Sequence, residues 1–576
     1  MVSIPGSHCG TGIRLPHKKH FPGKRSPRNR AFILACCAIC AHAEAETPEA
    51  YRLPLFKPDF EYRESKKKND LYSEEQTREA LPEVWRDVKR LEKFPDNLSD
   101  SIQLHRSVPD GAGGMIDFTF PPSPADLKAL EKICTLLPAK QMLESVKKGR
   151  YKGKKTTIFL HGEVGNILKE YYKRYRVTGD RKYLDEIIGY AGVVDWMLEH
   201  TPRNFLSTSS LKELTPAEQK QMTEDPVAAF PDEPSAAMMF RAHALSAWLL
   251  LEAVENRAIA EKEKRSDVEL AYRHVKLLVK YLESAVSGPD FRDQLGKGFK
   301  DRSGENTRRI AEEFNIPMRA AQFIEHEGWN RTWDYCAVLA LTATAIDHLE
   351  RLNLSTPSSK LGKTADLYQK ILRAAVDTFQ RENTCIVREG IPYIFHQYIA
   401  NRDNLPGTKP EVFRLGFPIY EGEDTGHCGS GARNFSMIWD AGDRDRFGVS
   451  VALLAAYGNG YALYLNSPTS TKGGKPWPGA RIEGPWSIAA RGVNSKPAPS
   501  INPHYYRLAP FSPHVIAAMQ QYLPRESKKS RNQKIKNRQC VNVTEPGNLD
   551  RLYAAYLYSL WKERRDHAAD PDFRRR

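Results

Sequence analysis

The sequence predicts an all-α protein whose helices pair into hairpins and form an incomplete ring of two layers. The first observation is a succession of about a dozen helix-length segments with apolar residues at helical spacing. The second is that many of them are apolar on more than one side, as in 242–251 and 337–346. Helices of this kind are buried on both faces, as the inner helices of a double ring would be. We therefore expect an (α/α) toroid of roughly six or seven helix pairs, with long loops on one rim.

The expected helices follow one another from Ser123 onward. The first begins at Pro124, and the pair 163–175 and 182–199 is joined by a turn at Val177–Asp180. Further helices are expected at 235–258, 267–285, 306–325, 331–352, 364–382, 447–457, 514–522 and 548–561. The long connections between them are irregular and no strict repeat period is present, which disfavours a helical-repeat solenoid, the alternative fold. Long loops in a compact domain are usually functional.

The N-terminus resembles an export signal. A basic, acid-free lead precedes the apolar stretch Ala31–Cys40 and the small residues Ala41–Ala45, which suit a cleavage site. An organellar transit peptide is the alternative, because the lead is rich in arginine. We expect a signal peptide at 1–45 and a protein that is secreted or periplasmic. An extended N-terminal wrap at 46–122, the toroid as catalytic domain at 123–565 and a charged tail at 566–576 would follow.

Composition limits the partners. The chain of 576 residues is 40% hydrophobic and 27% charged, as in soluble globular proteins, and no apolar run approaches the roughly 18 residues of a membrane span. Without residues 1–45 it has 79 basic and 70 acidic residues, a net charge of +9, which favours an anionic partner. The basic cluster 525–536 is typical of a solvated surface loop, so we expect no nucleic-acid partner.

Several classes of chemistry are disfavoured by missing motifs. None of the five cysteines beyond residue 45 belongs to a C-x-x-C pair, which argues against zinc and haem sites of that type. The sequence also lacks a P-loop, a dinucleotide fingerprint, an H-E-x-x-H motif and a nucleophile elbow, which argues against kinases, dehydrogenases, zinc proteases and α/β-hydrolases. We expect no cofactor and no metal ion.

The glycine-rich segment 419–433 is the strongest functional signal. It concentrates Glu421, Glu423, Asp424 and His427 just before an apolar run. Glycines allow polar side chains to come close together, and loops on a rigid scaffold often carry chemistry. We expect Glu423 and Asp424 to bind substrate and His427 to be catalytic. A capped turn, with Asp424 or Thr425 as the helix N-cap, is the simpler alternative.

A second polar cluster lies at the start of the helix expected at 331–352. Asn330 and Arg331 at a helix start can bind a carboxylate, helped by free backbone N–H groups. Arg331 is one turn from Tyr335 and is expected to lower the pKa of its phenol, making it a usable base. Trp333 is expected to bind substrate. The alternative is that Trp333 and Tyr335 pack inside the ring and Asn330 caps the helix.

Two further pairs of residues are candidates. Arg241 and His243 lie in an otherwise apolar helix, where polar side chains must be paired or face a wet cleft; a satisfied core histidine is the alternative. His396 and Tyr398 alternate along an extended segment and would face one side. Trp486, in the loop 466–508, could stack on a sugar ring.

Taken together, the hairpins, the Asn-Arg-x-x-x-Tyr helix start at Asn330 and the Glu-Asp-x-x-His-x-Gly loop at Glu423 resemble the (α/α)-toroid polysaccharide lyases. The most similar types act on uronate polymers, as alginate and glucuronan lyases do, and the likeness covers residues 124–562. It implies that Asn330 and Arg331 neutralise the uronate carboxylate. It also implies that Tyr335 is the acid or base and that His243, His396 or His427 is the base. Several alginate lyases have an adjacent Asn-His pair where this chain has Arg241 and His243.

We therefore expect a lyase that cleaves an acidic polysaccharide by β-elimination, with His427 and Tyr335 in one cleft. Removal of a proton next to a carboxylate requires fixed donors that stabilise the enolate charge. One alternative is a glycoside hydrolase on the same toroid, in which Glu423 or Asp424 faces a second carboxylate. The candidates for that second carboxylate are Glu325, Glu327 and Asp334. The other alternative is a non-catalytic helical-repeat protein that binds glycans.

Overall fold

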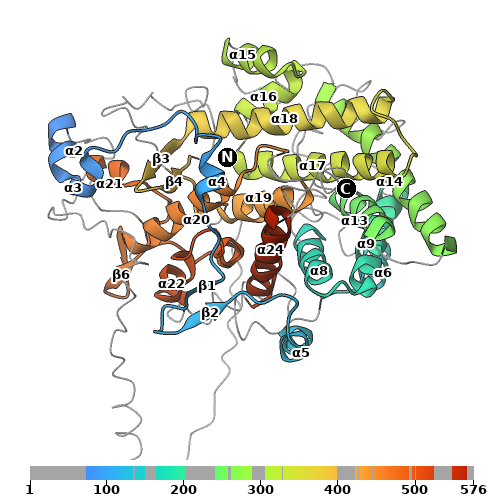
Figure 1. The fold of residues 1–576 in the computed structure, drawn as a ribbon, viewed down its shortest axis with the longest axis horizontal. Coiled ribbons are helices and arrows are strands. Elements are labelled where there is room, and N and C mark those ends of the chain that lie inside the picture. The colour runs from blue at the N-terminus through green and yellow to red at the C-terminus, as the bar shows by residue number, and fades with distance from the viewer. Residues whose placement is uncertain are drawn as a thin grey trace, which may run out of the picture. The chain divides into compact units, whose positions relative to one another are not determined.

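The protein is predominantly helical, which confirms the all-α prediction (Figure 1). In the part of the chain that the computed structural model describes, strands form three antiparallel hairpins. These are β1–β2 (Ser107–Pro109, Met115–Asp117), β3–β4 (Thr384–Arg388, Ile391–Phe395) and β5–β6 (Ser470–Lys472, Lys475–Trp477). The model describes residues 73–133, 136–149, 164–200, 240–256, 261–287, 305–326, 328–397, 422–425, 427–442, 446–491, 496–499, 501–523 and 548–566.

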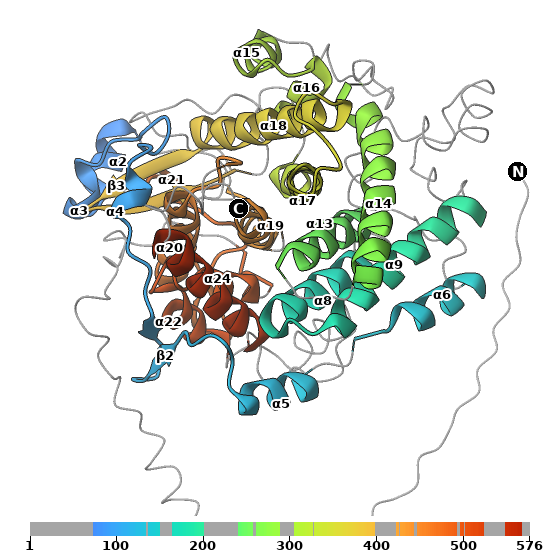
Figure 2. The ribbon, with the colours of Figure 1, turned by 45° about the vertical axis from the view of Figure 1, so that its right-hand side comes forward.

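Three helical hairpins form two layers. The pairs are α8 (Gly165–Thr178) with α9 (Arg181–His200), α13 (Arg241–Asn256) with α14 (Glu261–Ser287), and α17 (Trp329–Arg351) with α18 (Lys360–Glu382). Their first members α8, α13 and α17 pack on one another in that order, while α9, α14 and α18 cover them (Figure 2). Nearly every residue of α13 and α17 is buried. The sequence pattern that was apolar all round therefore belongs to inner helices, as predicted.

The inner helices continue into a closed circuit of contacts. Helix α19 (Gly429–Ala441) packs against α17, and the 3₁₀ helix η4 (Pro503–Leu508) packs against α19. Helix α24 (Asn548–Asp566) packs against both η4 and α8, and Figure 1 shows it beside α8. The circuit therefore runs from α8 through α13, α17, α19, η4 and α24 back to α8. Polar side chains described below occupy its interior.

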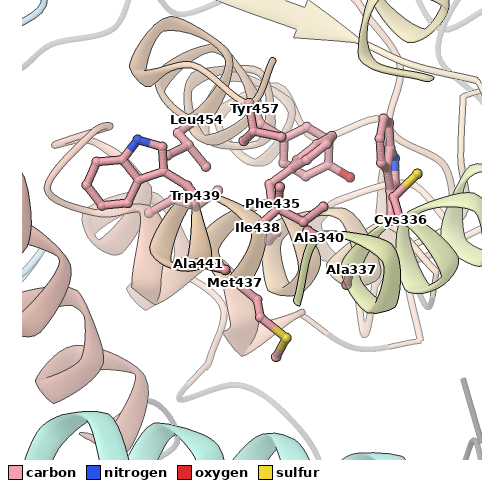
Figure 3. Close-up of a cluster of buried hydrophobic side chains, with 14 of the residues drawn as sticks. Cys336, Ala337, Ala340, Phe435, Met437, Ile438, Trp439, Ala441, Leu454 and Tyr457 are labelled. Atoms are coloured by element: carbon pink, nitrogen blue, oxygen red, sulfur yellow. The ribbon is translucent and has the colours of Figure 1, made fainter. Parts of the chain in front are cut away.

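An aromatic and aliphatic core joins α17, α19 and α20 (Val451–Asn466) (Figure 3). The rings of Phe435 and Tyr457 meet edge to face with centroids 5.1 Å apart. A Cβ atom added to Gly431 would lie 2.1 Å from the Tyr457 hydroxyl, so only glycine allows this approach. Gly431 of the glycine-rich segment therefore serves helix packing within α19.

The remaining elements surround this assembly. In the predicted N-terminal wrap, α2 (Glu74–Ala80) packs against α21 (Pro485–Arg491), and Leu91 bridges to Cys385 of β3. The short helices α3 (Glu83–Arg86) and α4 (Leu98–Ser101) follow, then α5 (Pro124–Ile133) and α6 (Ala139–Lys147); α22 (Val515–Gln520) packs against α20. Among the described helices, none combines the length and apolarity needed to cross a membrane.

One predicted helix is wrong. The segment 306–325 forms two helices, α15 (Glu305–Phe314) and α16 (Met318–His326), instead of one. The break occurs at Asn315, whose φ is +49°, and Pro317 follows it. A positive φ is incompatible with a continuing right-handed helix, and proline cannot supply the backbone donor.

Candidate active site

Side chains from the first two turns of four helices meet around Asp334. This carboxylate is buried in the second turn of α17 and accepts hydrogen bonds from Arg241 at 2.6 Å and Asn434 at 2.8 Å. The ammonium group of Lys169 lies 3.5 Å away. Lys169, Arg241 and Asn434 each fall within the first six residues of α8, α13 and α19. Each of these helix starts carries a partial positive charge, because its first backbone N–H groups lack intrahelical partners.

The charges of Arg433 and Arg241 add positive potential around Lys169. Burial lowers the pKa of Lys169 well below its usual value, the charge of Arg433 lowers it further, Asp334 raises it and Arg241 lowers it. Two guanidinium groups therefore act on one buried lysine, against the single carboxylate of Asp334. Such an arrangement attracts an anion, and a carboxylate can accept paired hydrogen bonds from a guanidinium.

Asn330 and Arg433 connect this cluster to the rim of the helices. The Ser430 hydroxyl donates to the Asn330 backbone oxygen at 3.1 Å and accepts from Asn434 at 3.1 Å. The side-chain Oδ1 of Asn330 is buried with no hydrogen-bond partner among the described residues. Arg433 is half-buried, and its Nη1 lies 3.5 Å from His504 Nε2. The predicted residues Asn330 and Arg241 are thus brought together at the start of α19.

His427 and Asp424 form a half-exposed pair immediately before α19. His427 Nδ1 lies 2.5 Å from the Asp424 carboxylate, and the two side chains are 51% and 41% exposed. The hydrogen bond that His427 donates to Asp424 raises the pKa of His427; burial and the charge of Arg331 lower it, and the charges of Asp424 and Glu423 raise it further. A carboxylate on Nδ1 orients an imidazole and stabilises its charged form, which leaves proton transfer to Nε2. The predicted residues Arg331, Asp424 and His427 therefore act on one another.

Glu423 and His396 meet beneath this pair. His396 Nε2 lies 2.6 Å from the Glu423 carboxylate and 3.1 Å from the Tyr457 hydroxyl, and all three side chains are buried. Burial raises the pKa of Glu423, and the hydrogen bond and charge of His396 lower it. The adjoining cavity of about 20 Å³ holds roughly one water molecule. Both side chains are buried and hold the loop in place, and their contact with substrate stays a prediction.

Arg241 and His243 are both paired, which is the first of the two predicted alternatives, and they face different sides of α13. Arg241 points to α17, whereas His243 points to the outer helix α9, where it lies 2.8 Å from Asp195. Two positions along a helix correspond to a rotation of about 200°. Since His243 is also fully buried, it does not share the surface that carries His427.

Two predictions about Tyr335 are wrong, namely that a nearby cation lowers its pKa and that it lines one cleft with His427. Burial raises the pKa of its phenol, instead of a nearby cation lowering it. The ring packs on Phe323 of α16 with centroids 4.6 Å apart, and the hydroxyl has no partner among the described residues. Tyr335 follows Asp334 by one position, about 100° of helical rotation. It therefore faces the outer layer and does not line one cleft with the half-exposed His427.

The tryptophans predicted to bind sugar are core residues. Trp333 stacks on Trp329 at 5.3 Å, and Trp486 meets Trp85 edge to face at 5.6 Å; both are almost fully buried. Of the carboxylates proposed for hydrolysis, Glu325 is buried against Asn306 and Thr307. Tyr398 and Glu327 lie outside the described residues.

Sequence reasoning missed a polar stripe on α8. Asn166, Lys169, Lys173 and Arg176 recur every three or four positions and so share one face. Lys173 lies 3.0 Å from Asp550 of α24, and Arg176 binds the buried Asp440 of α19 at 2.8 Å. Charged residues at helical spacing within an aromatic helix were the available signal.

Asp440 is the centre of a second polar layer inside the circuit. Besides Arg176, it accepts hydrogen bonds from the hydroxyls of Tyr172, Tyr553 at 3.3 Å and Tyr556 at 2.8 Å. Arg176 also binds Glu252 of α13. These contacts tie α8, α13, α19 and α24 together below the candidate active site.

Comparison of the chain with protein-family models, curated proteins and solved structures finds no match.

Proposed function

We propose that the protein is a polysaccharide lyase that cleaves an acidic, uronate-containing polysaccharide by β-elimination. The circuit of helices would be an incomplete (α/α) toroid, with its substrate cleft at the starts of α8, α13, α17 and α19. One observation supports this above the others. Lys169 and Arg241 are buried around Asp334 near the starts of their helices, and a half-exposed His–Asp pair immediately precedes α19, whose Asn434 also binds Asp334. Export by the segment 1–45, which lies outside the described residues, is part of the proposal.

The chemistry assigns a role to each group. In β-elimination a base removes the proton on C5, the electron pair forms the C4–C5 double bond, and the C4–O bond breaks. The proton on C5 is acidic only if the adjacent carboxylate is neutralised. Arg331, whose charge acts on His427, would neutralise it together with Asn330 and Arg433.

His427 is the base, and Asp424 holds its ring and stabilises the imidazolium that forms. That imidazolium can return the proton to the leaving C4 oxygen when both groups lie on the same face of the sugar ring. His427 can thus fill both the base and the acid roles, and Tyr335 is not needed for either.

Hydrolysis is less well supported. A hydrolase needs one protonated and one ionised carboxyl group facing a cleft. Here Asp334 is paired with Arg241, Glu423 with His396, and Asp424 with His427. Of these three carboxylates only Asp424 is substantially exposed. They therefore do not provide two carboxyl groups that could face a sugar across a cleft.

The decisive experiment incubates the protein with a panel of uronate polymers and follows the ultraviolet absorbance of unsaturated uronate. We expect His427→Gln to lose about 10²–10⁴ in rate, the usual worth of a positioned acid–base group. His200→Gln is the matched control, because that side chain is 46% exposed and lies on α9. New reducing ends without unsaturated product would indicate hydrolysis. Binding without cleavage would indicate a glycan-binding protein, and a normal rate for His427→Gln would remove His427 from the mechanism.

A further inference from the structure

Three metal-ligand side chains converge between α9, α13 and α14, on the side of α13 opposite Arg241. They are Asp195, His243 and His274, and one ligand atom from each lies within 4.8 Å of the other two. His243 Nε2 is 2.8 Å from the Asp195 carboxylate, and the two imidazole rings meet edge to face at 4.9 Å. We propose that this cluster binds a zinc-type divalent transition-metal ion. This site is separate from the proposed lyase site.

The identity of the ligands selects the class of metal. Two imidazoles and one carboxylate suit zinc and its neighbours, whereas calcium and magnesium prefer oxygen ligands. Both histidines are buried, and burial lowers the pKa of His274, which favours the neutral imidazole that a metal requires. Arg273 is the nearby opposing charge, acting on both Asp195 and His274.

The spacing of the ligands fits a metal with little movement. Zinc binds nitrogen and oxygen at about 2.0–2.2 Å, so ligand atoms of a tetrahedral site lie about 3.4 Å apart. The atoms here lie between 2.8 Å and 4.8 Å apart, so small side-chain rotations are enough. Asp195 is 48% exposed, which leaves a path to solvent for the metal and for a fourth ligand.

Unsatisfied polar atoms provide a second, independent observation. The Nδ1 atoms of His243 and His274 are buried with no hydrogen-bond partner among the described residues. Buried polar atoms in native proteins usually have a partner. A structural pairing of His243 Nε2 with Asp195 explains that contact, but it leaves the buried Nδ1 atom of His274 without a hydrogen-bond partner among the described residues. A metal ion gives both rings a ligand role and links three helices of the two layers.

The test uses the full chain, stripped of metal with a chelator and titrated with Zn²⁺ or Co²⁺. We expect one metal ion to bind per chain, and this binding should require all three side chains. Bound Co²⁺ should give a visible spectrum typical of a four-coordinate site. The Tm should rise when Zn²⁺ is added. His274→Gln keeps the His243–Asp195 hydrogen bond and should therefore fold. It should bind Zn²⁺ at least tenfold more weakly, since even outer partners of ligands are worth about 10- to 100-fold.

His200→Gln is the control, because it removes an exposed imidazole from the same helix as Asp195. It should bind Zn²⁺ as the wild type does. The proposal is overturned if wild type and His274→Gln bind Zn²⁺ with the same stoichiometry and affinity, or if wild type binds neither metal. Polymer cleavage does not enter this test, so its outcome is independent of the proposed lyase activity.

Discussion

Asp334→Asn should destabilise the protein by about 3–5 kcal/mol, the cost of removing one partner of a buried ion pair. The carboxylate is almost fully buried, 2.6 Å from Arg241 and 3.5 Å from Lys169. Asparagine keeps the shape of the side chain but removes the negative charge. Two buried cations would then face each other and Arg433 without that carboxylate.

Lys169→Met, the matched change, should cost no more than about 1 kcal/mol, because it removes a buried charge and retains an apolar stem of similar shape. Asp334 would keep Arg241 and Asn434 as partners. The wild type should also gain stability as pH rises. The pKa of Lys169 is lowered in the folded state, chiefly by burial, so between that pKa and 10.5 the unfolded chain binds more protons. Lys169→Met should lack this gain.

Urea denaturation of the three proteins, followed by circular dichroism at neutral pH and at about pH 9.5, measures both effects through shifts in the midpoint. The reasoning fails if Asp334→Asn is within about 1 kcal/mol of wild type, or if the two variants lose equal stability. Either result would show that the helix starts do not hold an excess of buried positive charge.

Three further predictions concern activity on uronate polymers. Asp424→Asn should move the acidic limb of the pH–rate profile to lower pH, because Asp424 raises the pKa of the base His427; an unmoved limb would contradict this pairing. Arg331→Ala should reduce kcat/KM by at least about 10², typical of losing a charge-stabilising group, while Arg309→Ala, 43% exposed on α15, should match wild type in the same assay. Tyr335→Phe should keep full turnover and change the free energy of unfolding by less than about 1 kcal/mol, because its hydroxyl has no partner among the described residues; a strong loss of turnover in the folded variant would return Tyr335 to the mechanism.

Much of the fold could be predicted from hydrophobic patterning. Segments 242–251 and 337–346 are apolar on all sides, and they lie in α13 and α17, the most buried helices. The break between α15 and α16 was missed because Asn315 and Pro317 were read as part of one amphipathic pattern. The hairpin β3–β4 was missed because its residues pair with each other across a turn inside a long connection.

The candidate site could be predicted only in part. The residue types of Arg241, Asn330 and His427 indicated chemistry, and the structure places them at neighbouring helix starts. The direction of each side chain could not be predicted, because one position along a helix turns it by about 100°. That rotation separates Tyr335 from Asp334. Lys169 was missed because its partner Asp334 is 165 positions away, and no local pattern records such a contact.

The polar layer around Asp440 has a consequence for how the helices are aligned. Apolar surfaces can slide past one another at little cost, but hydrogen bonds are directional and buried charges must be matched. If α19 slipped by one turn, about 5.4 Å, Asp440 would lose Arg176 and its three tyrosine partners together. This layer therefore fixes the positions of α8, α19 and α24 along their axes relative to one another. The anion-attracting cluster lies about two turns away and depends on the alignment of the helix starts. The polar layer around Asp440 sets that alignment.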